Sequence, residues 1–498
     1  MSSKMKRRSK LSPSLHICRA DSAWNSTPAR PWPFFGGPMT TFRLQQLKVT
    51  DYRCFPSLEI EFHEKLTVIV AANGAGKTAI LDAVGIALGP FIGAFDESVG
   101  KHFHSTDIRQ TAIRSTASKE MEYAVNGVGL EATGCFQFDG VGKDVGTKVV
   151  TWSRRLTGPV KTKTTIKEAK KLIDIGKDLQ AAVRTPGMNV VLPLVAYYGT
   201  GRLWQQKKLT RRKLTRSSRT IGYRDCLDPA SSFKSFVEWF AYWNDNISRE
   251  HNAARKQGRD YEPTEFDGYV SSVIRAVNIC LAPAGWKNID YSSALQELVA
   301  EHDEYGELPI SLLSDGIRNM IGMVADIAFR ATKLNGHLGA QAAAQTPGIV
   351  LIDEVDMHLH PSWQQTVLQS LTKAFPELQF IVTTHSPQVL STVPRESIRV
   401  VECDDSGCRA NAPDFSPLAH ESGDALARVM DTNPEPPLQL LEQVRLFEYL
   451  VRAGKELTEQ AQLLRTKLEE AGYQHHESDL AAWRFLASHS SNDGVEHG

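Results

Sequence analysis

The chain has 498 residues, 41% of them hydrophobic and 23% charged, which is ample apolar content for a globular core that needs no disulfide or metal staple. Its 57 lysines and arginines match its 57 aspartates and glutamates, giving a net charge of zero, so any binding to nucleic acid or membrane has to come from a local patch. No apolar run has the ~18 residues of a membrane span, and the seven scattered cysteines are typical of reduced thiols in a cytoplasmic protein.

The chain begins with a segment that is not expected to contribute to the fold. Residues 1–38 are rich in serine, proline and arginine, which indicates either a disordered tail or a start codon assigned too far upstream. From residue 42 to residue 62 apolar and polar residues alternate, as in half-buried strands. The run Leu66–Val70 is almost entirely β-branched, which predicts a buried parallel strand.

A glycine-rich loop follows that strand and precedes a helical stretch at residues 79–84. It reads Ala71-Ala72-Asn73-Gly74-Ala75-Gly76-Lys77-Thr78. Such glycines allow consecutive backbone N–H groups to point at phosphate oxygens at a helix N-terminus, so ATP is the expected ligand, with Lys77 on its β- and γ-phosphates and Thr78 on Mg²⁺. The other expected nucleotide contacts are Asn73, Gly74 and Gly76. Ala71 replaces the motif's first glycine and must therefore adopt a conformation that alanine tolerates.

The middle of the chain, residues 111–305, is predicted to be an insertion that is mixed at first and then helical. Residues 167–184 have a helical period, and amphipathic helices are predicted at 232–247 and 266–281. Residues 190–199 resemble a strand in which Pro193 favours an edge position.

A basic stretch interrupts this region. Between residues 207 and 224 there are eight lysines and arginines and no acidic residue. Such a run either grips a nucleic-acid backbone or forms a solvated surface loop, and the sequence leaves these alternatives equal. The predicted DNA contacts are Lys207, Lys208, Arg211, Arg212 and Lys213.

Two strand ends in the last third carry carboxylates and a histidine. Residues 349–352 predict a buried strand that ends at Asp353 and Glu354. Carboxylates at the carboxyl end of a parallel strand project into the crevice where ligands bind, so Asp353 is expected to hold Mg²⁺ and Glu354 to polarise the attacking water. A third strand at residues 378–383 leads to His385, which is placed to contact the γ-phosphate.

The segment Leu313-Ser314-Asp315-Gly316 precedes a helix predicted at residues 317–334. Ser314 suits an N-cap, and Gly316 permits close approach of a phosphate to the backbone. Alone, this pattern is an ordinary helix cap. Its position shortly upstream of Asp353 favours a second phosphate-binding motif.

In this order, the phosphate loop, Leu-Ser-Asp-Gly, hydrophobic-Asp-Glu and Thr-His-Ser-Pro resemble the ABC-type ATPase domains of the SMC-like and RecF-like group. That resemblance implies two heads that sandwich two ATP molecules. It implies that Ser314 and Gly316 act on the nucleotide held by the other copy. It also implies that Asp356 belongs to the loop crossing the dimer and that Gln110 senses Mg²⁺ and water.

A closer resemblance is to the bacterial family of ATP-binding proteins that includes PtuA, the ATPase of Septu-type anti-phage systems and of some retron operons. It rests on Ala196-Tyr197-Tyr198-Gly199, Phe236-Val237-Glu238-Trp239-Phe240 and Leu313–Gly316 followed by Met323-Val324-Ala325-Asp326-Ile327-Ala328. The resemblance covers most of residues 42–437 and implies a regulatory ATPase that works with a separate HNH nuclease.

The expected fold is α/β, an ABC-type (SMC/RecF-like) P-loop ATPase head with a mostly helical insertion and a helical C-terminal region. The expected head comprises residues 39–110 and 306–420, with the insertion at 111–305. The C-terminal region 421–498 is expected to be helical, notably over 438–471.

The expected function is ATP hydrolysis by a cytoplasmic regulatory subunit in phage defence, whose ATP-dependent dimerisation controls a partner HNH nuclease and which contacts DNA through the basic stretch. Two alternatives stay open: a DNA-repair ATPase of RecF or SMC type, and a non-hydrolysing ATP-binding scaffold. The absence of heptad repeats argues against long coiled-coil arms, and no membrane partner is expected.

Overall fold

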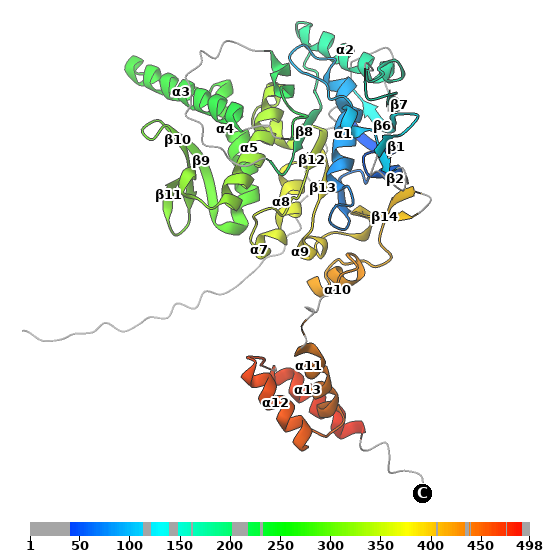
Figure 1. Cartoon of the computed structure of the whole chain (residues 1–498). Helices are drawn as coiled ribbons and strands as arrows, with labels where there is room; N and C mark the ends of the chain where they lie inside the picture. The colour runs from blue at the N-terminus through cyan, green and yellow to red at the C-terminus, as the bar shows by residue number, and fades with distance from the viewer. Residues whose placement is uncertain are drawn as a thin grey trace, which may run out of the picture. The chain divides into compact units, whose positions relative to one another are not determined.

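The computed structural model describes residues 40–112, 121–138, 148–160, 163–201, 218–229, 233–404, 407–433, 438, 440–474 and 476–490 (Figure 1). Residues 1–38, for which the sequence predicts a tail, lie outside these ranges. The predicted DNA contacts Lys207, Lys208, Arg211, Arg212 and Lys213 also lie outside them.

Within the described residues, ten strands form one mixed sheet in the order β7-β6-β1-β2-β15-β14-β3-β13-β12-β8. They are β1 (Thr41–Tyr52), β2 (Phe55–Glu61), β3 (Leu66–Val70), β6 (Val128–Gln137), β7 (Lys148–Leu156), β8 (Leu194–Tyr198), β12 (Gly348–Ile352), β13 (Leu378–Thr383), β14 (Ile398–Asp404) and β15 (Gly407–Asn411). Strands β14, β3, β13, β12 and β8 are parallel neighbours, whereas β7, β6, β1 and β2 pair antiparallel. The carboxyl ends of β3, β13 and β12 therefore meet at one edge, where ligands bind in such sheets.

The buried parallel strands that the sequence predicts are confirmed. β3, β12 and β13 are buried along nearly their whole length, as expected of strands covered on both faces. β8 is the outer strand of this half, and Pro193 directly before it has no N–H to offer a further neighbour. The edge position predicted for residues 190–199 is therefore confirmed.

Helices pack against both halves of the sheet. α1 (Lys77–Ile92) starts at the glycine-rich loop and packs on β13 and β6, and α5 (Asp315–Leu334) packs on β8. α2 (Lys170–Arg184) and α4 (Glu265–Leu281) confirm predicted helices. α3 (Lys234–Gln257) continues past the end that the sequence predicts. Its last turns are polar and mostly exposed, so they lack the apolar pattern on which the prediction depends. Among the described helices, none combines the length and apolarity that crossing a membrane requires.

One part of residues 111–305 belongs to the main sheet, and another part lies outside it. β6, β7 and β8 come from this segment because their alternating or continuous apolar residues complete the buried faces of the sheet. The part that leaves the sheet holds α3, α4 and a second sheet of β9 (Trp286–Ser292), β10 (Glu297–His302) and β11 (Gly306–Pro309). We therefore propose an insertion narrower than the sequence predicts, running from α3 to β11.

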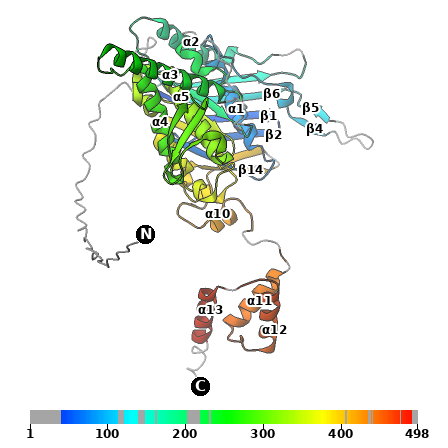
Figure 2. The same cartoon turned by 90° about the vertical axis from the view of Figure 1, so that its left-hand side faces the viewer.

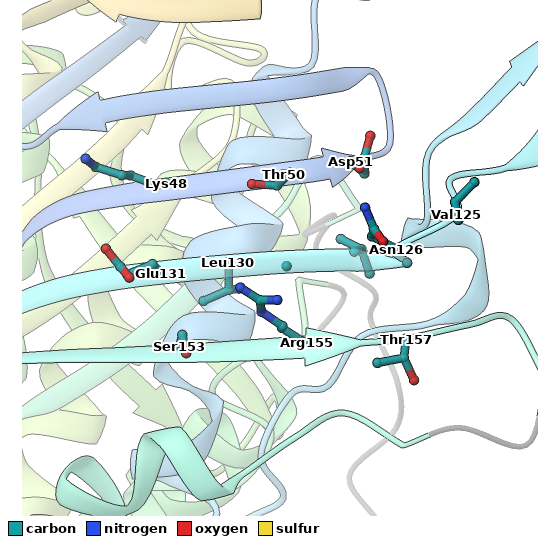
Figure 3. Close-up of a pocket in the computed structure, with 13 residues that line it drawn as sticks. Lys48, Thr50, Asp51, Val125, Asn126, Leu130, Glu131, Ser153, Arg155 and Thr157 are labelled. Atoms are coloured by element: carbon teal, nitrogen blue, oxygen red, sulfur yellow. The ribbon is translucent and has the colours of Figure 1, made fainter.

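The antiparallel half presents a polar face. Along β1, β2 and β6 exposed residues alternate with buried ones, and Figure 2 shows β6, β1 and β2 side by side. A hollow of about 670 Å³ lies on this face. Lys48 of β1 lies opposite Glu131 of β6, with Arg155 on β7 beyond them (Figure 3). The lining thus carries both signs of charge.

The described residues beyond 438 form a small helical unit with its own core. Its helices are α11 (Leu440–Arg452), α12 (Glu459–Glu470) and α13 (Glu477–Ser490), and its core includes Phe447, Val451 and Leu468. The helical structure predicted beyond residue 420, notably over 438–471, is confirmed, and it is divided between α11 and α12. Gly454 adopts a φ of 70° after α11, a left-handed conformation that ends helices and that glycine reaches without strain.

The sequence predicts reduced cysteines, and one pair contradicts this prediction. Cys403 and Cys408 are cross-strand partners in the β14–β15 hairpin and form a disulfide, with their Cα atoms 4.1 Å apart. The hairpin register, which the spacing of the two residues does not reveal, brings them together. Free cysteines among the described residues are Cys54, Cys135, Cys226 and Cys280.

Candidate nucleotide-binding site

The glycine-rich loop connects β3 to α1 in the conformation that its sequence predicts. Gly74 and Gly76 have φ values of 77° and 91°, which glycine alone adopts readily. Gly76 is needed for a second reason, because a Cβ there would lie 2.5 Å from the ring of Phe55 and 2.6 Å from Cys54 Sγ. Ala71 has no positive φ, so the alanine at the motif's first position fits without strain.

Lys77 is buried beneath this loop, with a relative exposure of 7%. Its Nζ donates to the backbone oxygens of Ala71 at 2.8 Å and Ala72 at 3.1 Å. Burial lowers the pKa of Lys77, while the carboxylates of Asp353, Glu354 and Asp356 act in the opposite direction. The ammonium is therefore held among neutral acceptors that charged phosphate oxygens would outcompete.

The first turn of α1 meets the end of β12 through a direct side-chain contact. Thr78 Oγ1 donates to Asp353 Oδ2 at 2.7 Å, across a separation of 275 residues in the chain. Thr383, at the end of β13, donates from its hydroxyl to Asp353 Oδ1 at 2.6 Å. The expected Mg²⁺ ligands, Thr78 and Asp353, are thus adjacent, and Thr383 fixes the orientation of the carboxylate.

This donor set fits Mg²⁺. Hydroxyl and carboxylate oxygens are ligands that Mg²⁺ accepts, and the ion usually completes its octahedron with waters and substrate phosphates. The described residues hold no cluster of three or more His, Cys, Asp or Glu side chains suited to a metal ion. Thr78 and Asp353 would therefore hold the ion only together with the nucleotide.

Glu354 is fixed by its backbone. Its N–H donates to Thr383 Oγ1 at 2.8 Å, and the flanking N–H groups of Asp353 and Val355 donate to the backbone oxygens of Tyr198 and Thr383. Its φ is 47°, a left-handed conformation that is uncommon for residues other than glycine. Such outliers occur where surrounding contacts over-determine the backbone, as they do here, so the half-buried carboxylate starts from a defined point at the sheet edge.

The segment after β13 lies against the segment after β12. Thr384 donates from its hydroxyl to Asp356, and Ser386 donates to Gln364 of α7 (Pro361–Gln364). His385 lies between these two anchors and is partly exposed. The structure therefore anchors the residues on both sides of His385, two positions after Thr383.

The Ser-x-Gly segment begins α5 as predicted. Ser314 is exposed, and its side chain makes no capping hydrogen bond to the helix. Gly316 packs against the backbone of His358, where a Cβ would lie 2.3 Å from the carbonyl oxygen. The segment is thus built onto the loop that follows Glu354, with the Ser314 hydroxyl left available to another molecule.

Comparisons with known proteins agree with this geometry. Residues 46–258 match a family model described as "AAA domain", and residues 233–391 match one described as "AAA domain, putative AbiEii toxin, Type IV TA system". The "Retron Vc95 probable ATPase" of Vibrio cholerae is 27% identical over 460 residues, which cover 83% of this chain and 84% of that protein. The "Septu protein PtuA" of Bacillus mycoides is 43% identical over 75 residues, 15% of this chain and 10% of that protein.

The chain is similar to ATPases of the retron and Septu type. The "Retron Ec83 probable ATPase" of Escherichia coli adds a match of 40% identity over 129 residues, 26% of this chain and 23% of that protein. Among solved structures, the "SMC head domain from Thermotoga maritima" aligns with a TM-score of 0.38 at 16% identity, covering 75% of this chain and 100% of that one. The α/β fold class predicted from the sequence is confirmed by the mixed sheet with its helices and agrees with the matched AAA domain model.

One predicted Mg²⁺ contact, Gln110, is not joined to the site within the described residues. Gln110 is exposed at the start of β4 (Gln110–Ala112), where it pairs with Tyr123 of β5 (Met121–Tyr123). Its role in sensing Mg²⁺ therefore stays a prediction. Of the basic stretch, Arg219 and Arg224 are described. Arg219 donates to the backbone oxygens of Leu334 and Val190, and Arg224 donates to Glu97 at 2.9 Å, so both make structural contacts.

An ion-pair network beside the loop was missed by the sequence analysis. Arg53, directly after β1, donates to Asp82 of α1 at 2.7 Å and to Asp107 at 2.8 Å. Lys101 donates to the other oxygen of Asp82 at 2.6 Å. Burial opposes the charge of Arg53, but Tyr52, Asp82 and Asp107 hold its pKa above the ordinary value. The signal available in the sequence was Asp82 on the first turns of the helix that Lys77 begins.

Proposed function

We propose that the chain binds Mg²⁺–ATP and hydrolyses it at a site completed by a second copy, as the regulatory subunit of an anti-phage defence complex. The observation that carries the proposal is the Thr78–Asp353 hydrogen bond of 2.7 Å, with Thr383 on the other carboxylate oxygen. It brings the phosphate loop, a Mg²⁺ carboxylate and the neighbouring Glu354 to one sheet edge, which is the arrangement that phosphoryl transfer to water requires.

Each residue has a defined task in this proposal. Lys77 would exchange two backbone acceptors for phosphate oxygens and so hold the β- and γ-phosphates. Glu354 would orient the attacking water and take its proton, and His385 would contact the γ-phosphate. Bound Mg²⁺ would supply charge neutralisation for the phosphate oxygens.

A second copy would supply Ser314 and Gly316. The exposed Ser314 hydroxyl makes no cap to its own helix, and the N-terminus of α5 adds backbone N–H groups and a positive dipole end suited to an anion. In their own chain, Ser314 and Gly316 are held by the contact between Gly316 and the backbone of His358. We propose that they serve the nucleotide of the other copy.

The defence role rests on the relatives. Proteins named as retron ATPases and as Septu PtuA match this chain, and we propose that this chain regulates a separate HNH nuclease. We propose DNA contact through Lys207, Lys208, Arg211, Arg212 and Lys213. A run of positively charged side chains binds phosphate backbones and releases the counterions held there. A test of the nuclease partner is co-expression of this chain, intact or as Lys77→Ala, with the HNH nuclease under test. Loss of nuclease control in the variant is expected.

Hydrolysis is tested with purified protein. We expect Mg²⁺-dependent release of phosphate from ATP that Lys77→Ala abolishes, while the matched change Lys48→Ala on the polar sheet face leaves it intact. Glu354→Gln is expected to trap an ATP-bound dimer visible by light scattering. Tight ATP binding without turnover at any protein concentration would favour the scaffold alternative.

The DNA-repair alternative has one observation in its favour. The "DNA double-strand break repair Rad50 ATPase" of Methanopyrus kandleri is 45% identical over 47 residues, which cover 9% of this chain. Stimulation of hydrolysis by DNA ends in the absence of any nuclease would favour this role over nuclease control.

A further inference from the structure

Two sequence motifs, Ala196–Gly199 and Met323–Ala328, have no role in the proposed nucleotide chemistry, and they are in contact inside the fold. Tyr198 ends β8 within Ala196–Gly199, and Asp326 lies on α5 within Met323–Ala328. The Tyr198 hydroxyl donates to Asp326 Oδ2 at 2.8 Å, across 128 residues of sequence, and both side chains are only 2% exposed. A buried phenol and carboxylate joined in this way fix the two elements relative to each other.

The contact belongs to a larger buried cluster. Arg330, one turn further along α5, donates from Nε to Asp326 Oδ2 at 2.7 Å and from Nη1 to the backbone oxygens of Gly222 and Arg224 at 2.9 Å. Phe233, at the start of α3, contacts the Tyr198 ring with centroids 6.5 Å apart. The cluster therefore holds α5 against β8 from several sides, and Figure 1 shows α5 beside β8 and β12.

The same tyrosine also reaches the catalytic edge through its backbone. The N–H of Asp353 donates to the Tyr198 carbonyl oxygen at 2.8 Å, which extends the register that pairs Ile352 with Tyr198. Tyr198 thus holds the Mg²⁺ carboxylate residue with its main chain and α5 with its side chain.

Helix α5 has a second attachment to the same catalytic segment. At its N-terminus, Gly316 packs directly on the His358 carbonyl, in the loop that follows Glu354. The two attachments, at Gly316 and Asp326, lie about 15 Å apart along the helix at ~1.5 Å per residue. Since a helix transmits displacement as a rod, a shift of the Asp353–His358 segment moves Ser314 with it.

We propose that Tyr198 and Asp326 are positioning residues that couple the Mg²⁺ end of a chain's own site to the Ser314 that the chain presents to a second copy. This inference rests on the proposed function, because it needs two copies that share their nucleotides. Nucleotide binding at Asp353 and Glu354 sets the position of α5, and α5 sets the Ser314 hydroxyl against the nucleotide of the other copy. The two sites of the dimer then act together rather than independently.

The test compares two matched variants. Tyr198→Phe removes the hydroxyl that reaches Asp326, and Tyr223→Phe removes an equally buried hydroxyl that donates to the Pro193 oxygen at 2.7 Å. Measured for wild type and both variants are the Kd for a fluorescent ATP analogue, kcat, the Hill coefficient for ATP and the melting temperature. We expect Tyr198→Phe to keep the Kd within about twofold while kcat falls about tenfold and the Hill coefficient falls to one. Tyr223→Phe is expected to keep the wild-type Hill coefficient and kcat.

Several results would overturn the coupling role. One is a Tyr198→Phe protein with the kcat and Hill coefficient of Tyr223→Phe. Another is a fall in nucleotide affinity for Tyr198→Phe as large as its fall in kcat. A third is a melting temperature far below that of Tyr223→Phe. Either of these results would show that Tyr198 contributes to folding only. A wild-type protein that neither hydrolyses ATP nor pairs with it would instead refute the proposed function. The two failures are therefore distinguishable.

Discussion

Gly316 and His358 touch through their backbones: a Cβ on Gly316 would lie 2.3 Å from the His358 carbonyl oxygen. The start of α5, with its Ser314, is therefore positioned by the loop that follows Glu354 in the same chain. The contact makes Gly316 a structural necessity in addition to its expected place near a phosphate.

We expect Gly316→Ala to displace the start of α5, because a backbone oxygen cannot yield as a flexible side chain does. Hydrolysis should fall about 100-fold for a displacement near 1 Å, with a lower melting temperature. Ser314→Ala is the control, since the exposed Ser314 side chain makes no cap to its helix; it should lose hydrolysis without losing stability. A Gly316→Ala protein as stable and as active as wild type would contradict the contact.

Thr383→Val removes the hydroxyl that donates to Asp353 and accepts the Glu354 N–H. Residues that orient metal ligands typically contribute about 10–100-fold in metal affinity or activity, so the Mg²⁺ concentration at half-maximal hydrolysis should rise by that order. The same substitution at Thr372, whose hydroxyl donates to the Leu368 oxygen on α8 (Val367–Ala374), should leave the Mg²⁺ dependence unchanged. An unaltered Mg²⁺ dependence in Thr383→Val would remove Thr383 from the site.

Arg154 replaces a hydrogen bond that Pro90 removes from α1. Proline has no N–H for the oxygen of Ile86, four residues earlier, and Arg154 Nη1 donates to that oxygen at 2.7 Å from β7. Arg154→Met should cost about 2 kcal/mol of unfolding free energy, because it leaves buried acceptors unpaired. Pro90→Ala restores the N–H, so in the double variant about 1 kcal/mol should be recovered. Urea denaturation of the four proteins measures this coupling, and strict additivity would argue against it.

Lys333 makes stability depend on pH. Burial lowers its pKa to about 8, while Glu265 acts in the opposite direction, and its Nζ lies 3.5 Å from the centre of the Trp239 ring. The unfolded lysine, with a pKa near ~10.4, binds a proton that the folded one releases above pH ~8, so stability rises with pH between these values and the penalty is fully present below them. The wild type should therefore gain about 1–3 kcal/mol relative to Lys333→Met from pH 8 to 10. Equal slopes for both proteins would show that the folded lysine titrates normally.

The sequence by itself determined the features that depend on neighbouring residues. Asn73 to Thr78 form one turn whose glycines need positive φ, so the phosphate loop is readable from a short string of letters. Asp353 and Glu354 end a run of apolar residues, and the edge position of β8 follows from Pro193. Each signal is local, because backbone conformation and strand burial act over a few residues.

The tertiary structure decided which distant residues share a site. Thr383 lies on the strand next to β12, and only that pairing gives its hydroxyl to Asp353. Cys403 and Cys408 bond because of the hairpin register. The donation from Tyr198 to Asp326 spans 128 residues and follows from α5 packing on β8. Strand order and helix packing depend on the buried faces of all the elements together. No local pattern in the sequence could therefore predict these contacts.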